Sequence, residues 1–405
     1  MPGMGRRRDA AEQRRARLAG EGAGPPAEPE APLGYAHLPV LLAETLAQLR
    51  PGPGQALVDA TVGGGGHAAA LVAALAPGGR LLCLDRDPAA CAAAEERLRP
   101  EADRSGVALL VVHSNYARLE EVLAGAGWTD ADGMLFDLGA SSHQLDSAER
   151  GFSYREDAPL DMRMDPTQGT TAYHLVNGLS EDELAELIRR FGEERWASRI
   201  AAFIVRRRRS HGLISTTGEL VEAIKAAVPS GARRGGPHPA RRTFQALRIA
   251  VNNELGHLEA ALRTSVRHLR PGGRLVVISF HSLEDRTVKH LFRELTRGCT
   301  CPPDWPVCRC GARPVLRPLL DRPLQAGAAE CAANPRARSA KLRAALRLSD
   351  AGSEVPAEDA AAPRRPAPGA GAAPPLAAVG GLRSVAETLR LGRRQPAVLH
   401  ARRGE

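Results

Sequence analysis

The sequence predicts an α/β protein built on a mostly parallel, Rossmann-like sheet. Three observations carry this prediction. A short apolar run ends in Asp59 and leads into four consecutive glycines, Gly63 to Gly66, and an Ala/Leu-rich run follows them. Two further apolar runs also end in an acid, at Asp85 and at Asp137. Strands that alternate with helical patterns form parallel sheets, and such sheets bind ligands at the carboxyl ends of their strands.

The first third of the chain contains most of the predicted sheet. Residues 1–34 are charged, rich in Pro and Gly and without periodicity, so they predict a disordered extension. Leu42, Leu46 and Leu49 fall at helical spacing and predict a helix over residues 40–49. The patterns that follow predict strands at residues 56–58, 80–85, 107–112 and 132–137, and helices at residues 68–76 and 88–98.

The alternation of strands and helices breaks after the fourth strand. Ser180 to Glu183 forms a capping box, which predicts the start of a helix. No convincing strand pattern occurs between about residues 144 and 250. Later patterns predict helices at 196–208, 217–228 and 244–266, a turn at 271–273, strands at 274–279 and 340–348, and a short helix at 382–391. We therefore expect a sheet domain at 35–145 and 251–348, a helical insert at 146–250 and a disordered tail at 349–405.

Charge favours an anionic partner. The formal net charge is +9, and nearly all the basic residues are arginine. A GC-rich genome explains the same composition equally well. The 14 aromatic residues are too few for binding through a broad stacking platform.

Targeting signals are not evident. No apolar run reaches the length of about 18 residues that a transmembrane helix needs, so we expect no membrane span. The N-terminus has no apolar core of a signal peptide and carries several acids, which argues against secretion and mitochondrial import. A cytoplasmic protein with reduced thiols is expected.

Four closely spaced cysteines leave two interpretations open. Cys299, Cys301, Cys308 and Cys310 offer four thiolates within a short stretch, which is enough to bind one zinc ion. The Cys-x-Cys spacing is tighter than in common zinc sites, and reduced free thiols are the favoured interpretation.

The acids at the strand ends bear on the type of cofactor. Asp85 follows Gly63 by 22 residues, a spacing at which an acid can bind two ribose hydroxyls. That pattern suits a dehydrogenase as well as a methyltransferase. Asp137 would be poorly placed beside a pyrophosphate but could pair with the amino group or sulfonium of S-adenosylmethionine. The alternative for Asp137 is that it only caps the next turn. Tyr116 is a candidate for the adenine face, and its alternative is that it only covers the edge of the sheet.

Long motifs resemble the bacterial small-subunit (16S) ribosomal RNA cytosine-N4 methyltransferase family. They lie at residues 37–42, 59–67, 85–88, 137–146, 149–153, 159–165, 192–195, 242–249, 278–286 and 334–339. The resemblance implies a class I S-adenosylmethionine-dependent methyltransferase fold with an inserted helical substrate domain. It also implies S-adenosylmethionine as cofactor and a cytosine of the decoding region as target. By motif match the cofactor contacts are Gly65, Gly66, His67, Asp85, Tyr116, Asp137 and Gln144.

The catalytic group is less well defined. Many amino-methyltransferases carry Asn/Asp-Pro-Pro-aromatic after the fourth strand, whereas this chain has Asp137-Leu138-Gly139-Ala140. Asp137, or a main-chain carbonyl of the following loop, is a candidate proton acceptor. His281 is a candidate for the substrate site and equally for a structural histidine. A DNA amino-methyltransferase and a non-catalytic ribosome-assembly factor are the alternatives.

The basic insert is the expected RNA-binding region. Its candidate residues are Arg206, Arg207, Arg241 and Arg242, with a solvated basic face as the alternative for the first two. Asp161, Arg163 and Asp165 fit a salt-bridged loop as well as substrate contacts. The expected partner is 16S rRNA within an assembled or assembling 30S subunit, without a membrane, and a homodimer is left open.

Overall fold

A computed structural model describes residues 39–349 apart from residues 168, 234–235, 299–300, 303–304 and 308. The chain divides into two units, residues 1–36 and 37–405, and everything described here belongs to the second. The predicted N-terminal extension, the tail and its short helix lie outside the described residues, as does the start of the motif at residues 37–42.

A seven-stranded sheet confirms the predicted fold class. Its strand order is β3-β2-β1-β4-β5-β7-β6, in which β1 to β5 run parallel and β7 lies antiparallel to its two neighbours. The strands are β1 Ala56–Asp59, β2 Arg80–Asp85, β3 Ala108–His113, β4 Ala131–Asp137, β5 Leu269–Ser279, β6 Leu316–Pro318 and β7 Lys341–Arg347. Parallel pairing brings the carboxyl ends of β1, β2 and β4 to the same edge of the sheet.

The helices follow the sheet in a regular alternation, which the insert interrupts. They are α2 Leu42–Leu49, α3 Gly66–Leu75, α4 Pro88–Ser105, α5 Leu119–Gly125, α6 Ser142–Asp146, α7 Ala172–Gly178, α8 Glu181–Gly192, α9 Ala197–His211, α10 Thr217–Ala227, α11 Arg241–Asn252, α12 Glu254–His268, α13 Ser282–Thr296 and α14 Ala328–Ala333. Short 3-10 turns are η1 Tyr116–Arg118, η2 Ala148–Arg150, η3 Ser230–Arg233 and η4 Pro335–Ser339. None of the helices in the described part of the chain has the length and apolar content that a membrane span needs.

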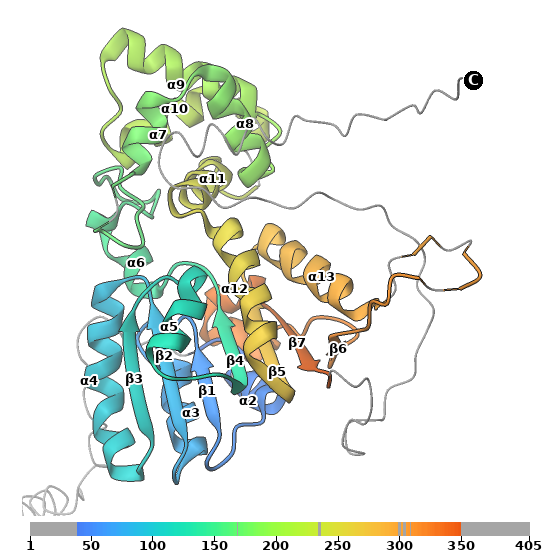
Figure 1. Cartoon of the computed structure of the whole chain (residues 1–405). Coiled ribbons are helices and arrows are strands. Elements are labelled where there is room, and N and C mark those ends of the chain that lie inside the picture. The colour runs from blue at the N-terminus through green and yellow to red at the C-terminus, as the bar shows by residue number, and fades with distance from the viewer. Residues whose placement is uncertain are drawn as a thin grey trace, which may run out of the picture. The chain divides into compact units, whose positions relative to one another are not determined.

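Alternating strand residues divide the sheet's core into two layers. Leu57, Leu81 and Leu135 pack with α2, α3 and α4, whereas Val58, Leu82 and Met134 pack with α5, α12 and α13 (Figure 1). This alternation is what a sheet covered on both faces requires, because successive side chains of a strand point to opposite sides.

A third core belongs to the helices between β4 and β5. It contains buried residues from Phe152 to Leu255 and is separate from the two layers on the sheet. Figure 1 shows α7 to α11 gathered beyond the carboxyl ends of the strands. Ser180 caps α8 as predicted: its hydroxyl accepts from the Glu183 N–H, while the Glu183 carboxylate accepts from the Ser180 N–H. The exact domain boundaries stay a prediction.

Two predicted elements are wrong in detail. The helix expected at 244–266 is two helices, α11 and α12, because Asn253 adopts a left-handed conformation between them. Asn tolerates that conformation better than most residues. The fifth strand begins at Leu269 rather than Arg274, and the turn expected at 271–273 is an irregularity within it, with Gly272 at a positive φ of 84°. The sequence patterns also do not predict β6, α5 or α13.

Gly192 tests the packing inside the insert. A Cβ on Gly192 would lie 2.6 Å from the carbonyl oxygen of Arg242, so α8 and α11 approach too closely for any side chain. Gly192→Ala is therefore expected to lower the free energy of unfolding by roughly 1–3 kcal/mol, as overpacking does. Urea unfolding of the full chain measures this.

Gly178→Ala is the matched control. Gly178 also ends a helix of the insert, but in the described part of the chain no atom outside that helix lies within 4 Å of a Cβ built there. Equal stability of the two variants would contradict the close approach of α8 to α11.

Candidate active site

Three acids meet at the carboxyl edge of the sheet. Asp59, Asp85 and Asp137 are the last residues of β1, β2 and β4. These strands are neighbours, and Asp59 pairs in register with Cys83 of β2 and Leu135 of β4. The two strand-end acids expected from the sequence are thus brought to one place, and Asp59 is a third that the motif contains but the site prediction did not use.

The glycine turn bends the chain between β1 and α3. Gly63 and Gly65 have positive φ angles of 50° and 77°, which glycine adopts without strain. The Gly63 N–H donates to Asp85 Oδ2 at 2.9 Å, and no described residue beyond its chain neighbours lies within 4 Å of a Cβ built on Gly63. Gly66 has a different reason to be glycine, since its Cβ would lie 3.3 Å from Pro39. The turn therefore leaves open space on one side and packs tightly on the other.

His67 links the turn to Asp137. Its Nε2 lies 3.1 Å from the Val40 carbonyl oxygen, and its Nδ1 lies 3.4 Å from Asp137 Oδ2. Burial lowers the pKa of His67, but the hydrogen bond and charge of Asp137, with the charge of Asp59, outweigh it and raise the pKa above its ordinary value. A protonated imidazole suits this site because both of its nitrogens then donate.

Asp137 keeps one carboxylate oxygen without a partner. Its Oδ2 faces His67, and its backbone N–H donates to the Thr61 hydroxyl at 2.6 Å. The other oxygen, Oδ1, is buried and accepts no hydrogen bond from any described residue. Buried acceptors are nearly always satisfied in folded proteins. An unsatisfied carboxylate oxygen at a strand end is therefore a feature that a cationic or hydrogen-bond-donating ligand would complete.

Asp85 is held in place by backbone donors. Its Oδ1 accepts from the Asp87 N–H and its Oδ2 from the Gly63 N–H, each at 2.9 Å. Burial raises the pKa of Asp85 despite these two hydrogen bonds. Each oxygen retains a free lone pair, as an acid that accepts two ribose hydroxyls requires.

Tyr116 lies in η1, directly after β3. Its ring meets that of Phe136 edge to face, with centroids 5.9 Å apart, and the side chain is half-buried. Burial raises the pKa of its hydroxyl above the ordinary value. The ring thus covers the sheet next to the Asp85 edge, which fits both of the interpretations offered for it.

Gln144 already has partners for both ends of its side chain. Its oxygen accepts from the Ser141 N–H at 3.1 Å, and its amide nitrogen donates to Asp87 Oδ2 at 2.8 Å. Arg150 donates to the same Asp87 oxygen at 2.9 Å. Arg150 and Asp87 were not singled out from the sequence, although both belong to its motifs. Their ion pair ties the loop after β4 to the loop after β2.

His281 caps α13. The Glu284 N–H donates to His281 Nδ1 at 3.4 Å, and Glu284 Oε2 accepts from the N–H groups of Phe280 and His281 at 2.8 and 3.2 Å. His281 Nε2 lies 3.1 Å from Glu284 Oε1. These contacts favour the structural interpretation of His281 over a role in proton transfer.

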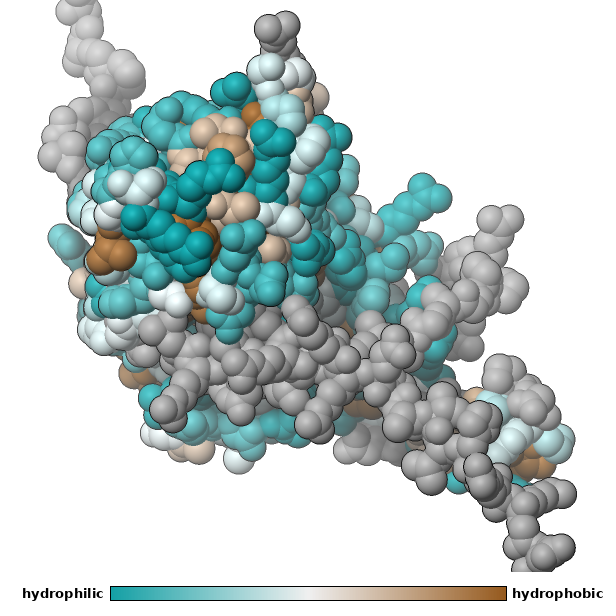
Figure 2. Space-filling model, turned by 90° about the horizontal axis from the view of Figure 1, so that it is seen from above, coloured by the Kyte–Doolittle hydropathy of each residue, from teal (hydrophilic) through white to brown (hydrophobic). Residues whose placement is uncertain are grey.

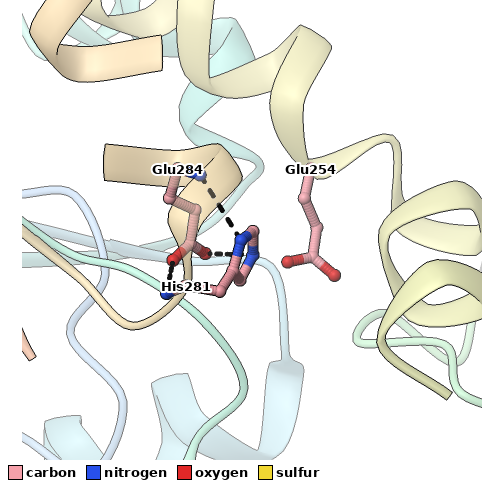
Figure 3. A group of neighbouring side chains, drawn as sticks. All are labelled: Glu254, His281 and Glu284. Carbon is pink, nitrogen blue, oxygen red and sulfur yellow. Dashed lines mark hydrogen bonds and ion pairs between the residues drawn. The ribbon is translucent and has the colours of Figure 1, made fainter. Parts of the chain in front are cut away.

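Glu254 completes a cluster around His281. Figure 3 shows the His281 ring between the carboxylates of Glu284 and Glu254. One ring nitrogen of His281 and one carboxylate oxygen of each glutamate lie within 4.8 Å of one another, close enough to be tested as a metal site. Arg248 donates to both oxygens of Glu254 at 2.8 Å. Burial raises the pKa of Glu284, but His281 and Arg248 outweigh it and lower the pKa. Because the guanidinium already neutralises Glu254, the cluster suits an ion-pair network better than a divalent cation.

The expected RNA-binding arginines differ in availability. Arg206, Arg241 and Arg242 are exposed, and Arg206 lies over the Phe203 ring at 4.8 Å. Arg207 is half-buried and pairs with Glu219 at 3.2 Å, so part of its charge is neutralised. Figure 2, the view from above onto the inserted helices, shows that this face is mostly hydrophilic.

The remaining candidates have simpler outcomes. The Arg163 guanidinium donates to both carboxylate oxygens of Asp161, with Nη2 at 2.7 Å from Oδ2. This pairing favours the salt-bridged loop over substrate contacts. Cys301 forms no disulfide with any described residue, whereas Cys299 and Cys308 lie outside the described residues. The zinc interpretation therefore stays a prediction.

Comparisons with known proteins agree with the motifs. Residues 34–348 match the model of the MraW methylase family. A protein of Symbiobacterium thermophilum named ribosomal RNA small subunit methyltransferase H is 56% identical over 323 residues, which is 80% of this chain and 100% of that protein. Proteins of the same name from Heliobacterium modesticaldum and Geobacter sulfurreducens are each 55% identical, over 78% of this chain and 99% of theirs.

Asp59 is expected to make stability depend on pH. Burial raises the pKa of its carboxyl from 3.8 to about 7, with His67 opposing the shift. A folded-state pKa above the unfolded one means that stability is lost as pH rises between these two values. Asp59→Asn should therefore become more stable relative to the wild type as pH rises from about 4 to about 8. Urea unfolding at several pH values measures the difference.

Asp103→Asn is the control for this experiment, because the Asp103 side chain is 67% exposed on α4. Its stability relative to the wild type should stay nearly constant over the same range. A pH-independent difference for Asp59→Asn would mean that the buried carboxyl does not titrate as described.

Proposed function

The chain belongs to the MraW methylase family, and from this premise we propose that it methylates the exocyclic N4 of one cytosine in the decoding region of 16S rRNA. It is an S-adenosylmethionine-dependent methyltransferase with a class I fold. The observation that carries the proposal is the unpartnered Oδ1 of Asp137 at the carboxyl end of β4. A buried anionic acceptor at that place suits a cationic cofactor and not a pyrophosphate.

The site residues fit this cofactor. S-adenosylmethionine supplies an electrophilic methyl group and carries an ammonium group and two ribose hydroxyls. We assign the ammonium group to Asp137, the hydroxyls to Asp85 and the adenine face to Tyr116. Gly65, Gly66 and His67 would border the amino-acid end, where His67 orients Asp137. Gln144 would act through the loop that it braces, since both ends of its side chain already have partners.

The reaction requires alignment more than activation. The lone pair of cytosine N4 is delocalised into the ring, so the nucleophile is weak. Reacting atoms have to be brought within about 3 to 3.5 Å in line. The bond from N4 to the methyl carbon forms as the methyl–sulfur bond breaks, and N4 then loses a proton. Asp137 would accept that proton, or a main-chain carbonyl of residues 138–141 would accept a hydrogen bond from the N4–H until water takes the proton, with His281 fixing the neighbouring loop.

The insert supplies the RNA-binding surface in this proposal. Support comes from the exposed Arg241 and Arg242 at the start of α11 and from Arg206 on α9. Arg207 is the weakest of the four sequence candidates because Glu219 pairs with it. We further propose that the enzyme binds its RNA within a 30S subunit in the cytoplasm.

Asp137→Asn tests the function and the site together. It removes the negative charge at nearly constant shape, so the affinity for S-adenosylmethionine should fall about tenfold or more. Methyl transfer should fall on the order of a hundredfold, because the charge also positions the methyl group. Calorimetry with the cofactor, and transfer of labelled methyl groups to 30S particles, free rRNA and naked DNA, measure both.

Asp146→Asn is the control, since the Asp146 side chain is 64% exposed in α6, shortly after the same strand. The wild type should transfer labelled methyl groups to rRNA and not to DNA. Mapping of the modified nucleotide should place the methyl group on cytosine N4. Labelling of DNA alone, or no transfer at all, would contradict the proposed function. Unchanged methyl transfer in Asp137→Asn would reject the role assigned to Asp137 but not the proposed function.

Removing Arg241 and Arg242 should weaken RNA binding in a salt-dependent way. If each contacts one phosphate, the double alanine variant lowers the slope of log affinity against log salt by about 1.4 for single-stranded RNA. Filter binding between low and moderate salt measures the slope. Arg104→Ala is the control, because Arg104 is 76% exposed on α4 of the sheet domain. An unchanged slope in the double variant would place the RNA elsewhere.

A further inference from the structure

The loop after β4 has no aromatic residue on which the base to be methylated could stack. Asp137 is followed by Leu138, Gly139 and Ala140, and Ala140 packs against the core of the insert. A base taken out of a folded nucleic acid is commonly held by stacking on aromatic or apolar side chains. The reacting cytosine of the proposed function therefore needs a stacking surface from another element.

Phe280 reaches that loop from the neighbouring strand. Asp137 of β4 pairs in register with Ile278 of β5, and the Leu138 N–H donates to the Ile278 carbonyl oxygen at 3.0 Å. Gly139 and Phe280 each follow this pair by two residues, so they lie beside each other just past the ends of the two strands. A Cβ built on Gly139 would lie 3.7 Å from Phe280 Cδ2, and among the described residues beyond its chain neighbours it would meet no other heavy atom within 4 Å.

The position of Phe280 is fixed, and its ring is not fully covered. Glu284, which is 2% exposed, accepts from the Phe280 N–H at 2.8 Å. The Phe280 side chain packs with one side against the core layer that contains Ile278 and Leu342, and it remains half-buried. Gly139 has no side chain to screen it, and its φ of 97° disfavours any other residue.

The surroundings of Phe280 belong to the site. The residues that follow it reach the insert, because the Ser282 hydroxyl donates to Glu193 at 2.6 Å and Arg286 pairs with Glu193 at 2.8 Å. Asp137, with its unpartnered oxygen, begins the loop that Phe280 touches. The ring is therefore near the acceptor for the cofactor and near the domain that binds the substrate.

We propose that Phe280 is the residue on which the target cytosine stacks, supplied by β5 in place of the aromatic residue missing after β4. This inference rests on the proposed function. Because a stacking surface touches the substrate and not the cofactor, its loss should act on the RNA and leave S-adenosylmethionine binding unchanged.

Phe280→Leu and Phe280→Tyr separate stacking from packing. Leucine retains apolar packing but has no ring face, whereas tyrosine retains the face. For Phe280→Leu we expect kcat/KM with 30S particles to fall about ten- to a hundredfold, the usual effect of losing one base–aromatic stack. For Phe280→Tyr we expect a change of less than about threefold. Calorimetry should give both variants the wild-type affinity for S-adenosylmethionine.

A second readout does not depend on turnover. The target cytosine of a 16S fragment is replaced by pyrrolocytosine, whose emission is quenched when the base stacks. The wild type and Phe280→Tyr should quench the bound RNA, and Phe280→Leu should not. Wild-type kcat/KM or quenching in Phe280→Leu, equal losses in both variants, or a loss of cofactor affinity would each overturn the inference. Failure of the wild type to methylate cytosine N4 would instead reject the proposed function.

Discussion

The contact between His67 and Asp137 is the interaction on which the site depends. Asp137 is half-buried and follows four buried residues of β4, Gly133 to Phe136, so its carboxylate is costly unless a cation or hydrogen-bond donors face it. His67 supplies the partner from the first turn of α3, and the Val40 carbonyl fixes the other side of its ring. Only one oxygen of Asp137 is satisfied in this way. The chain thus stabilises the carboxylate and still leaves an acceptor for a ligand.

A second set of contacts joins the insert to the sheet. Asp87 accepts from both Gln144 and Arg150, and Arg150 also donates to the carbonyl oxygens of Arg163 and Met164. Arg86, directly after β2, donates to the Asn252 carbonyl oxygen at 3.0 Å, and the Asn252 side chain bridges the Met162 carbonyl and the Met164 N–H at the end of α11. These contacts are polar and directional, unlike the apolar cores on either side. They set how the loop after β4 lies against the strand ends.

Sequence patterns predicted the fold well because they depend on local periodicity. The strand ending at Asp85 and the helix capped by Ser180 follow from apolar spacing and capping chemistry. The break at Asn253 was missed because the residues on both sides of it continue a helical pattern. The contacts of Asp59, Arg150 and Phe280 were missed for another reason. Their partners lie far away in the sequence, and only the pairing of β2, β1, β4 and β5 brings them together.

The separate core of the insert has a consequence for how the family's substrate preference can change. Buried residues from Phe152 to Leu255 pack among themselves, while the acids proposed to bind the cofactor are held by the sheet. A substitution on the outer face of α9 or α11 can therefore alter recognition without disturbing the groups that handle the methyl donor. Chemistry and recognition can evolve at different rates in such a chain, in which polar contacts around Asp87, Asn252 and Glu193 join the two parts.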